Sequence, residues 1–238
     1  QFCSPQAERY PFKVLNKRNA YQIWETTPKL AVKATKIDRT NSRKTRMAYI
    51  IPNFCFTANI TTSGRKPEEY FTTSPIEAQI SPIIETSNVT DPETGSSELV
   101  RTRANKITWS LQVPTFSGID ENDMPPLQGK NYIETDGDFI TYVKQPRRII
   151  AVSDYNGSVQ DKEAGNLRSN ILNQLEKDGL KVKLSSDERP ITGFMSFDAK
   201  VCWNKKGNIG MAIYEYRPKF IGKGNKIFVE LEETNDKY

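Results

Sequence analysis

Hydrophobic and polar residues alternate over several short stretches of this chain, the pattern expected of β-strands that bury one face. The clearest example is residues 105–114, where Ile107, Trp109, Leu111 and Val113 are separated by single polar residues. Weaker alternation and short apolar runs between turn-forming residues predict further strands. These lie at residues 12–16, 20–26, 29–38, 76–84, 138–145, 147–154, 191–199, 209–217 and 227–231.

Two longer stretches carry apolar residues at spacings of three and four, which builds one apolar face on an α-helix. The first covers residues 42–58 and contains Pro52, which predicts a kink. The second covers residues 159–178 and is followed by Gly179, a residue well suited to the end of a helix. The sequence thus predicts two main helices, each lying between groups of strands.

The order strands, helix, strands occurs once in each half of the chain. This order predicts an α+β fold: a pseudo-duplicated antiparallel sheet, distorted and barrel-like, with the two helices packed on it. The halves cover about residues 8–114 and 130–217, joined by a Pro- and Gly-rich connection at 114–130. We expect residues 1–238 to form a single domain, with an acidic C-terminal tail at 218–238.

Polar and charged stretches are expected at the surface. Residues 61–69 and 85–98, rich in Thr, Ser, Gly, Pro and Glu, predict exposed loops. Basic residues gather at 36–46 and 144–148, a feature that phosphate binding would need. However, Lys plus Arg (34) exceeds Asp plus Glu (29) by only five across the 238 residues, so we interpret these stretches as solvated faces and expect no nucleic-acid partner.

The chain contains no histidine, which excludes several classes of site. Ser-His and Cys-His nucleophile pairs and His-ligated metals are ruled out, and we expect no metal site. No apolar run is long enough to cross a membrane as a helix, so we expect no membrane span.

The first residue is Gln1 rather than Met, and three N-x-Ser/Thr sequons are present, at Asn59, Asn88 and Asn156. Together these features predict a processed, secreted glycoprotein. Its three cysteines then predict one disulfide and a further thiol, or an intermolecular bond. We expect Cys3 to pair with Cys55 or with Cys202, and the sequence leaves the choice open.

Several short phrases resemble those of the SOUL, or haem-binding-protein, family and occur in the same order. They are ERYPFKVL at 8–15, AYQIW at 20–24, FTTSPI at 71–76, ITWSLQVP at 107–114, DYNG at 154–157 and FMSFD at 194–198. The stretch 208–214 lacks the Arg-Asn-Glu of the closing strand of that family, which marks a divergent member. The resemblance implies the α+β fold described above.

The resemblance also implies a ligand. Members of this family bind tetrapyrroles in a trough beside the first helix, with basic groups near the propionates. The corresponding residues here are Arg43, Arg46, Met47, Ile50, Ile51 and Phe54. We therefore expect a secreted binding protein for a hydrophobic small molecule, first of all haem, a porphyrin or a bilin. Without histidine, a metal-free tetrapyrrole or weakly ligated haem is favoured. The alternative is that the apolar stripe only packs on the sheet.

Two other functions stay open. One is an enzyme acting on a small hydrophobic substrate in the same cleft. Carboxylates such as Glu77 lie on predicted strands, although each is expected to be a surface group or an ion-pair partner. Similarity to bacterial effector-binding domains makes Glu215 the one catalytic candidate. The other function is an extracellular structural or recognition protein, which would favour a homodimer.

Overall fold

The structure, a computed structural model, describes residues 7–9, 11–39, 70–114, 139–156, 162–197, 200–204, 212–215, 224–234 and 238. Most of them belong to one nine-stranded sheet, in which every pairing is antiparallel. Its strands lie in the order β2 (Phe12–Lys17), β3 (Gln22–Thr26), β9 (Arg148–Tyr155), β13 (Asn225–Leu231), β10 (Thr192–Ser196), β6 (Ile76–Thr90), β7 (Ser97–Gln112), β4 (Lys29–Asp38) and β8 (Phe139–Gln145).

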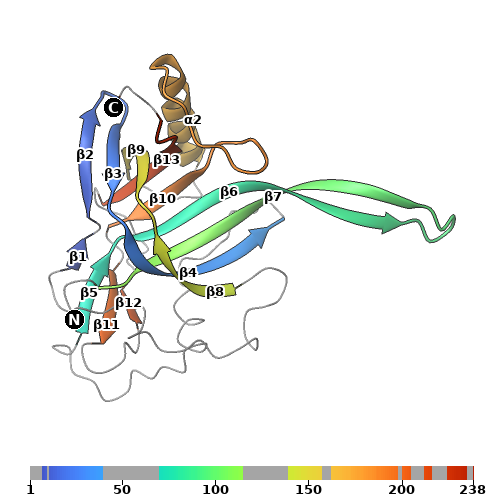
Figure 1. Cartoon of the computed structure of the whole chain (residues 1–238), viewed down its shortest axis with the longest axis horizontal. Coiled ribbons are helices and arrows are strands. Elements are labelled where there is room, and N and C mark those ends of the chain that lie inside the picture. The colour runs from blue at the N-terminus through green and yellow to red at the C-terminus, as the bar shows by residue number, and fades with distance from the viewer. Residues whose placement is uncertain are drawn as a thin grey trace.

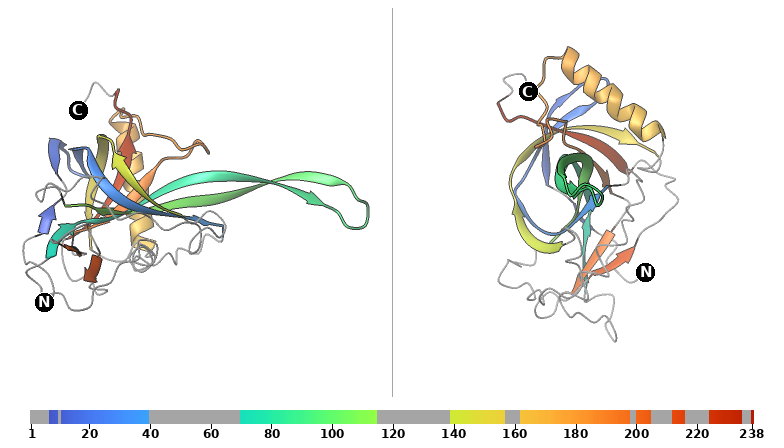
Figure 2. Two further views of the ribbon diagram at one scale, coloured as in Figure 1. Left: turned by 60° about the horizontal axis from the view of Figure 1, so that its bottom comes forward. Right: turned by 90° about the vertical axis from the view of Figure 1, so that its right-hand side faces the viewer.

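The large sheet is curled into a half-barrel (Figures 1 and 2). Strands β9 and β6 are separated in it by β13 and β10, which in a flat sheet would set them about 14 Å apart. Nevertheless, Arg148 of β9 and Glu77 of β6 meet at 2.7 Å. The sheet must therefore bend toward the face that carries these two side chains, which we call the concave face.

A smaller sheet lies beside the half-barrel (Figure 1). It contains β1 (Ala7–Arg9), β5 (Tyr70–Ser74), β11 (Lys200–Asn204) and β12 (Ala212–Glu215), with β1 parallel to β5. The buried indole of Trp203 donates to the hydroxyl of Thr73 at 2.8 Å, and that hydroxyl donates to the carbonyl of Gln112 at 2.8 Å. This chain of hydrogen bonds joins the small sheet to β7 of the large one.

The main apolar core lies on the opposite, convex face of the large sheet. Because side chains alternate along a strand, Ile76 and Ala78 point to the convex face while Glu77 points to the concave one. Helix α2 (Lys162–Lys177) packs on this face against β13 and β9, burying Ile171 and Leu175. The burial of such apolar side chains is the main force holding the helix to the sheet.

The distal parts of β6 and β7 form a two-stranded arm that projects from the half-barrel (Figures 1 and 2). The two strands pair from Ile76–Leu111 to Thr90–Ser97. The pairing with β10 ends at Ile80 of β6, and the pairing with β4 ends at Asn105 of β7. Beyond Ile80 and Asn105, the two strands of the arm pair only with each other among the described residues.

Much of this architecture agrees with the sequence-based predictions. The antiparallel, barrel-like character of the sheet is confirmed, as is the strand at 29–38. The predicted helix at 159–178 is observed as Lys162–Lys177. The predicted helix at 42–58, the loop at 61–69 and most of the connection at 114–130 lie outside the described residues.

One prediction is wrong. Residues 85–98 are not a loop, because strands β6 and β7 continue through most of this stretch and leave only a short turn at 91–96. Their Thr, Ser and Asn side chains are polar because both faces of a projecting ribbon meet water. The strand predicted at 227–231 is confirmed as β13, which lies between β9 and β10 in the large sheet.

The close approach of β10, β13 and β6 requires glycine at position 193. A Cβ atom there would overlap the ring of Phe228 and lie 2.5 Å from the carbonyl oxygen of Ala78. We predict that Gly193→Ala lowers the free energy of unfolding by about 3 kcal/mol, since an overpacked site must shift backbone as well as side chains. Urea denaturation measures this change.

Gly95 in the turn of the arm is the matched control. It has a φ of +68° but no atom within 4 Å of a Cβ placed there. Gly95→Asn is expected to cost less than about 1 kcal/mol, because Asn tolerates this conformation. Equal costs at the two positions would show that the contact with Phe228 and Ala78 does not restrict position 193.

Candidate functional site

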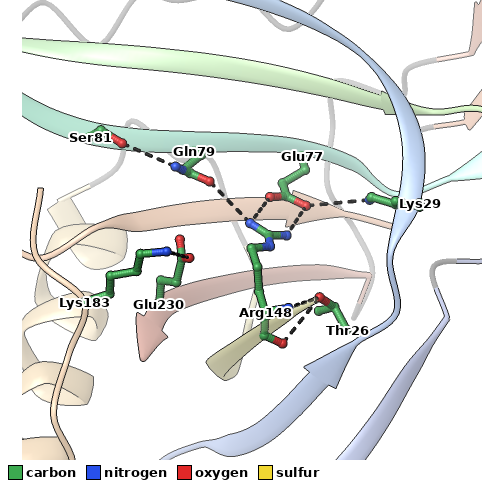
Figure 3. Close-up of polar contacts among 8 residues, drawn as sticks. All are labelled: Thr26, Lys29, Glu77, Gln79, Ser81, Arg148, Lys183 and Glu230. Atoms are coloured by element: carbon green, nitrogen blue, oxygen red, sulfur yellow. Dashed lines mark hydrogen bonds and ion pairs between the residues drawn. The ribbon is translucent and has the colours of Figure 1, made fainter. Parts of the chain in front are cut away.

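A buried cluster of charged side chains lies on the concave face of the half-barrel (Figure 3). Glu77 of β6, Arg148 of β9 and Lys29 of β4 have side chains only 2%, 5% and 2% exposed. Each alternates along its strand with residues of the apolar core, which directs it to the concave face. We call these three residues the buried charge cluster.

The ion pair between Glu77 and Arg148 is bidentate. Nη1 of Arg148 lies 2.7 Å from Oε1 of Glu77, and Nη2 donates to Oε2 at 3.0 Å. Nζ of Lys29 lies 3.9 Å from the same Oε2. A planar guanidinium matches a carboxylate in this parallel arrangement, which makes the pair strong and geometrically specific.

Further groups hold the guanidinium in place. Nη1 of Arg148 donates to Oε1 of Gln79 at 3.3 Å. The amide oxygen of Gln145, when it is turned toward the guanidinium, also accepts hydrogen bonds from Nε at 2.8 Å and from Nη2 at 2.7 Å. The ring of Phe228 lies 5.5 Å from the guanidinium carbon, a cation–π distance. Arg148 is thus fixed by its neighbours and has little freedom to turn toward a ligand.

Burial and neighbouring charges shift the pKa values in the cluster. Burial acts to raise the pKa of the Glu77 carboxyl, but Arg148 and Lys29 outweigh it and hold the pKa below its usual value. Burial lowers the pKa of the Lys29 amine to about 7, with Glu77 opposing and Arg148 reinforcing the shift. Near neutral pH, Glu77 is therefore ionised and Lys29 is partly neutral.

A cavity of about 670 Å³ opens beside the buried charge cluster. Basic, acidic, amide and apolar side chains all contribute to its wall. The lining residues include Lys33, Gln79, Gln145, Arg148, Ile149, Lys183, Ile191, Glu230 and Leu231. A cavity of this size is in the range of small-molecule sites, and its mixture of apolar and polar groups is typical of them.

Lysines 33 and 183 present two amines to the cavity in different ways. Nζ of Lys183 forms an ion pair with Oε1 of the buried Glu230 at 3.0 Å. Lys33 is half-buried, and no hydrogen bond or ion pair joins its Nζ to any residue within the described ranges. Burial lowers the pKa of Lys33, Glu77 opposes that shift and Arg148 reinforces it. Lys33 thus presents its amine to the cavity with no direct partner among the described residues.

The family resemblance implies a set of ligand-binding residues in the predicted helix at 42–58. Arg43, Arg46, Met47, Ile50, Ile51 and Phe54 all lie outside the described residues. The catalytic candidate Glu215 ends β12, and its side chain is also outside the description. These assignments remain predictions.

The predicted modification sites fall in different places. Asn88 is exposed on the arm and Asn156 is exposed just after β9, whereas Asn59 lies outside the described residues. Cys202 lies on β11 with its side chain undescribed, and Cys3 and Cys55 are outside the described ranges. The glycosylation and disulfide assignments therefore also remain predictions.

Within the described part of the chain, no group of three or more His, Cys, Asp or Glu residues could hold a metal ion. In the same ranges, no helix combines the length and apolar character needed to cross a membrane.

Comparison with known proteins adds no family assignment. The sequence matches no model of a known protein family and no curated protein. The geometry of the concave face is therefore the basis from which function is inferred.

Sequence reasoning missed most of this site, although a signal was present. In the predicted strand at 29–38, Lys29, Ala31 and Lys33 alternate with the apolar Leu30 and Val32. Such alternation is usually interpreted as a solvated face, and here the curl of the sheet encloses that face instead. Glu77 was expected to be a surface group or an ion-pair partner, and the ion pair is confirmed.

The buried ion pair predicts a large cost for removing one partner. Glu77→Gln is expected to lower the free energy of unfolding by about 3 kcal/mol, because the buried guanidinium of Arg148 then has no carboxylate to neutralise its charge. The control is Glu85→Gln, which breaks a pair with Arg39 whose side chains are 28% and 40% exposed. That change should cost less than about 1 kcal/mol in the same denaturation experiment. Similar costs for both variants would contradict the burial argument.

The depressed pKa of Lys29 predicts a pH dependence of stability. Between pH 7 and 9 the unfolded chain keeps this amine protonated, whereas the folded protein releases the proton above about pH 7. Because the unfolded state then binds more protons, stability rises with pH, by an amount on the order of 1 kcal/mol per pH unit. Urea denaturation at several pH values measures the slope. Lys29→Met should reduce it by this contribution, and an unchanged slope would contradict the prediction.

Proposed function

We propose that this protein binds a small organic ligand carrying a carboxylate, in the cavity of the concave face. The observation that carries the proposal is Lys33, a half-buried cation that lines the cavity and has no ion-pair partner among the described residues. A cation desolvated by burial gains free energy when an anion is placed beside it. A carboxylate is the simplest group that supplies such an anion.

The remaining wall suits the rest of such a ligand. Arg148 adds positive potential, although its donors are already engaged by Glu77, Gln79 and Gln145. Ile191 lines the same cavity and supplies apolar contact for a hydrocarbon framework, whereas the side chains of Ile149 and Leu231 belong to the apolar core of the convex face. The ligand in this proposal is therefore amphipathic, with its carboxylate near Lys33 and its apolar part near Ile191.

Tetrapyrroles remain the leading specific candidate within this class. Their propionates supply the carboxylates and their macrocycle supplies the apolar surface. The family resemblance favours this class of ligand, although it places the ligand beside residues 43–54 and not in this cavity. We retain, as part of the proposal, a secreted and glycosylated protein, since the exposed positions of Asn88 and Asn156 suit modification.

The role of Lys33 predicts a specific loss of affinity. Lys33→Met should weaken binding of para-(hydroxymethyl)benzoate about tenfold, since a charge-assisted hydrogen bond is worth roughly 1.5–3 kcal/mol. The matched control is Lys36→Met, on the same strand but on its opposite face, which should leave the affinity unchanged. Isothermal titration calorimetry gives both values. Equal affinities of the Lys33→Met variant and the unmodified protein would overturn the role of Lys33.

An absorption spectrum tests the narrower candidate. Titration with haem or biliverdin should produce a shifted band that saturates at one ligand per chain. If neither tetrapyrrole binds while the benzoate does, the ligand belongs to another group of carboxylates. If none of the three binds, the proposed function is wrong.

A further inference from the structure

Three lysine amines lie in or near the cavity, and they differ in accessibility and in pairing. Lys29 has a lowered pKa, but it is fully buried and is not part of the cavity wall. Lys183 lines the cavity, but its Nζ is held by Glu230 at 3.0 Å and its side chain is 55% exposed. Lys33 alone of these three combines a lowered pKa, a place in the cavity wall and no direct partner among the described residues.

These properties are those of a nucleophilic lysine. An ammonium ion has no lone pair to donate, so an amine attacks a carbonyl group only in its neutral form. Burial and the positive charge of Arg148 lower the pKa of Lys33 and together outweigh Glu77 and Glu230, which favour the charged form. The cavity gives a ligand room to reach the amine, which the enclosed Lys29 does not have.

We propose that Lys33 forms a reversible imine with a small aldehyde or ketone that carries a carboxylate. This inference depends on the proposed function, because it assigns covalent chemistry to a ligand of the same cavity. This aldehyde or ketone would lie in a different pose from a ligand held only by its carboxylate. Its carboxylate would lie in the positive potential of Arg148 instead of pairing with Lys33, so that its carbonyl carbon approaches Nζ of Lys33.

The reaction balances without an oxidant or a reductant. The lone pair of Nζ forms a bond to the carbonyl carbon while the π pair of the C=O bond moves to oxygen. One proton passes from nitrogen to that oxygen, giving a carbinolamine. The nitrogen lone pair then forms the C=N bond while the C–O bond breaks and its electron pair leaves with oxygen. The second proton of nitrogen passes to that oxygen, so that water departs and a neutral imine remains. One amine and one carbonyl compound thus yield one imine and one water.

Glu230 is the group assigned to move the proton. Its carboxylate belongs to the cavity wall, and Lys33 and Glu230 interact electrostatically. It is buried and held by Lys183, so its position is fixed. An ionised carboxylate can take a proton from nitrogen and return it to the leaving oxygen.

Reductive trapping tests this inference on the intact chain. The protein is incubated at pH 7 with para-carboxybenzaldehyde and sodium cyanoborohydride, which reduces an imine to a stable secondary amine. Intact mass followed by peptide mapping should find one carboxybenzyl group, on Lys33. The adduct should be lost in Lys33→Arg, which keeps the positive charge, and retained in Lys17→Arg, which changes an exposed lysine. An excess of para-(hydroxymethyl)benzoate should suppress labelling by competition.

The outcomes separate this inference from the proposed function. Labelling spread over exposed lysines with Lys33 unmodified would overturn imine formation. If para-(hydroxymethyl)benzoate still binds in that case, and binds more weakly to Lys33→Met, the binding function stands without covalent chemistry. If the benzoate does not bind and no adduct forms on Lys33, both proposals are wrong. Labelling of the enclosed Lys29 in place of Lys33 would show that the low pKa alone determines reactivity, and would also overturn the inference.

Discussion

The bidentate ion pair between Glu77 and Arg148 is the interaction on which the concave face depends. It joins β6 to β9 across two intervening strands, so it can form only when the sheet is curled. The curl in turn buries both charges, which strengthens their attraction and makes the loss of either one costly. Curvature and ion pair are therefore coupled: neither is expected to persist unchanged without the other.

The two faces of the large sheet have different tasks as a result. The convex face carries the apolar core and holds helix α2, and the burial of its side chains supplies most of the driving force for folding. The concave face contributes less apolar surface and instead organises charge around a cavity. Lys33 is part of that organisation. Burial lowers the pKa of its amine, and its side chain lines the cavity.

The sequence predicted the strands better than it predicted their environment. Alternation identified the strand at 29–38, and apolar spacings of three and four identified the helix near 162–177. Local periodicity of this kind reports which residues share a face. It could not report that Lys29 and Lys33 face an enclosed space, because the curl depends on pairing between strands far apart in the chain. The failure at 85–98 has a related cause. A ribbon exposed on both faces loses the alternation that marks a half-buried strand, so Thr, Ser and Asn there resembled a loop.

The projecting arm affects how the size of this protein should be measured. Strands β6 and β7 extend well beyond the half-barrel, so the molecule is markedly longer in one direction than in the others (Figure 1). An elongated particle diffuses more slowly than a sphere of equal mass. In gel filtration, a 27.1 kDa monomer of this shape will elute ahead of compact standards of the same mass and resemble a dimer. Light scattering, which reports mass independently of shape, is therefore the appropriate measure of whether the chain is a monomer or a homodimer.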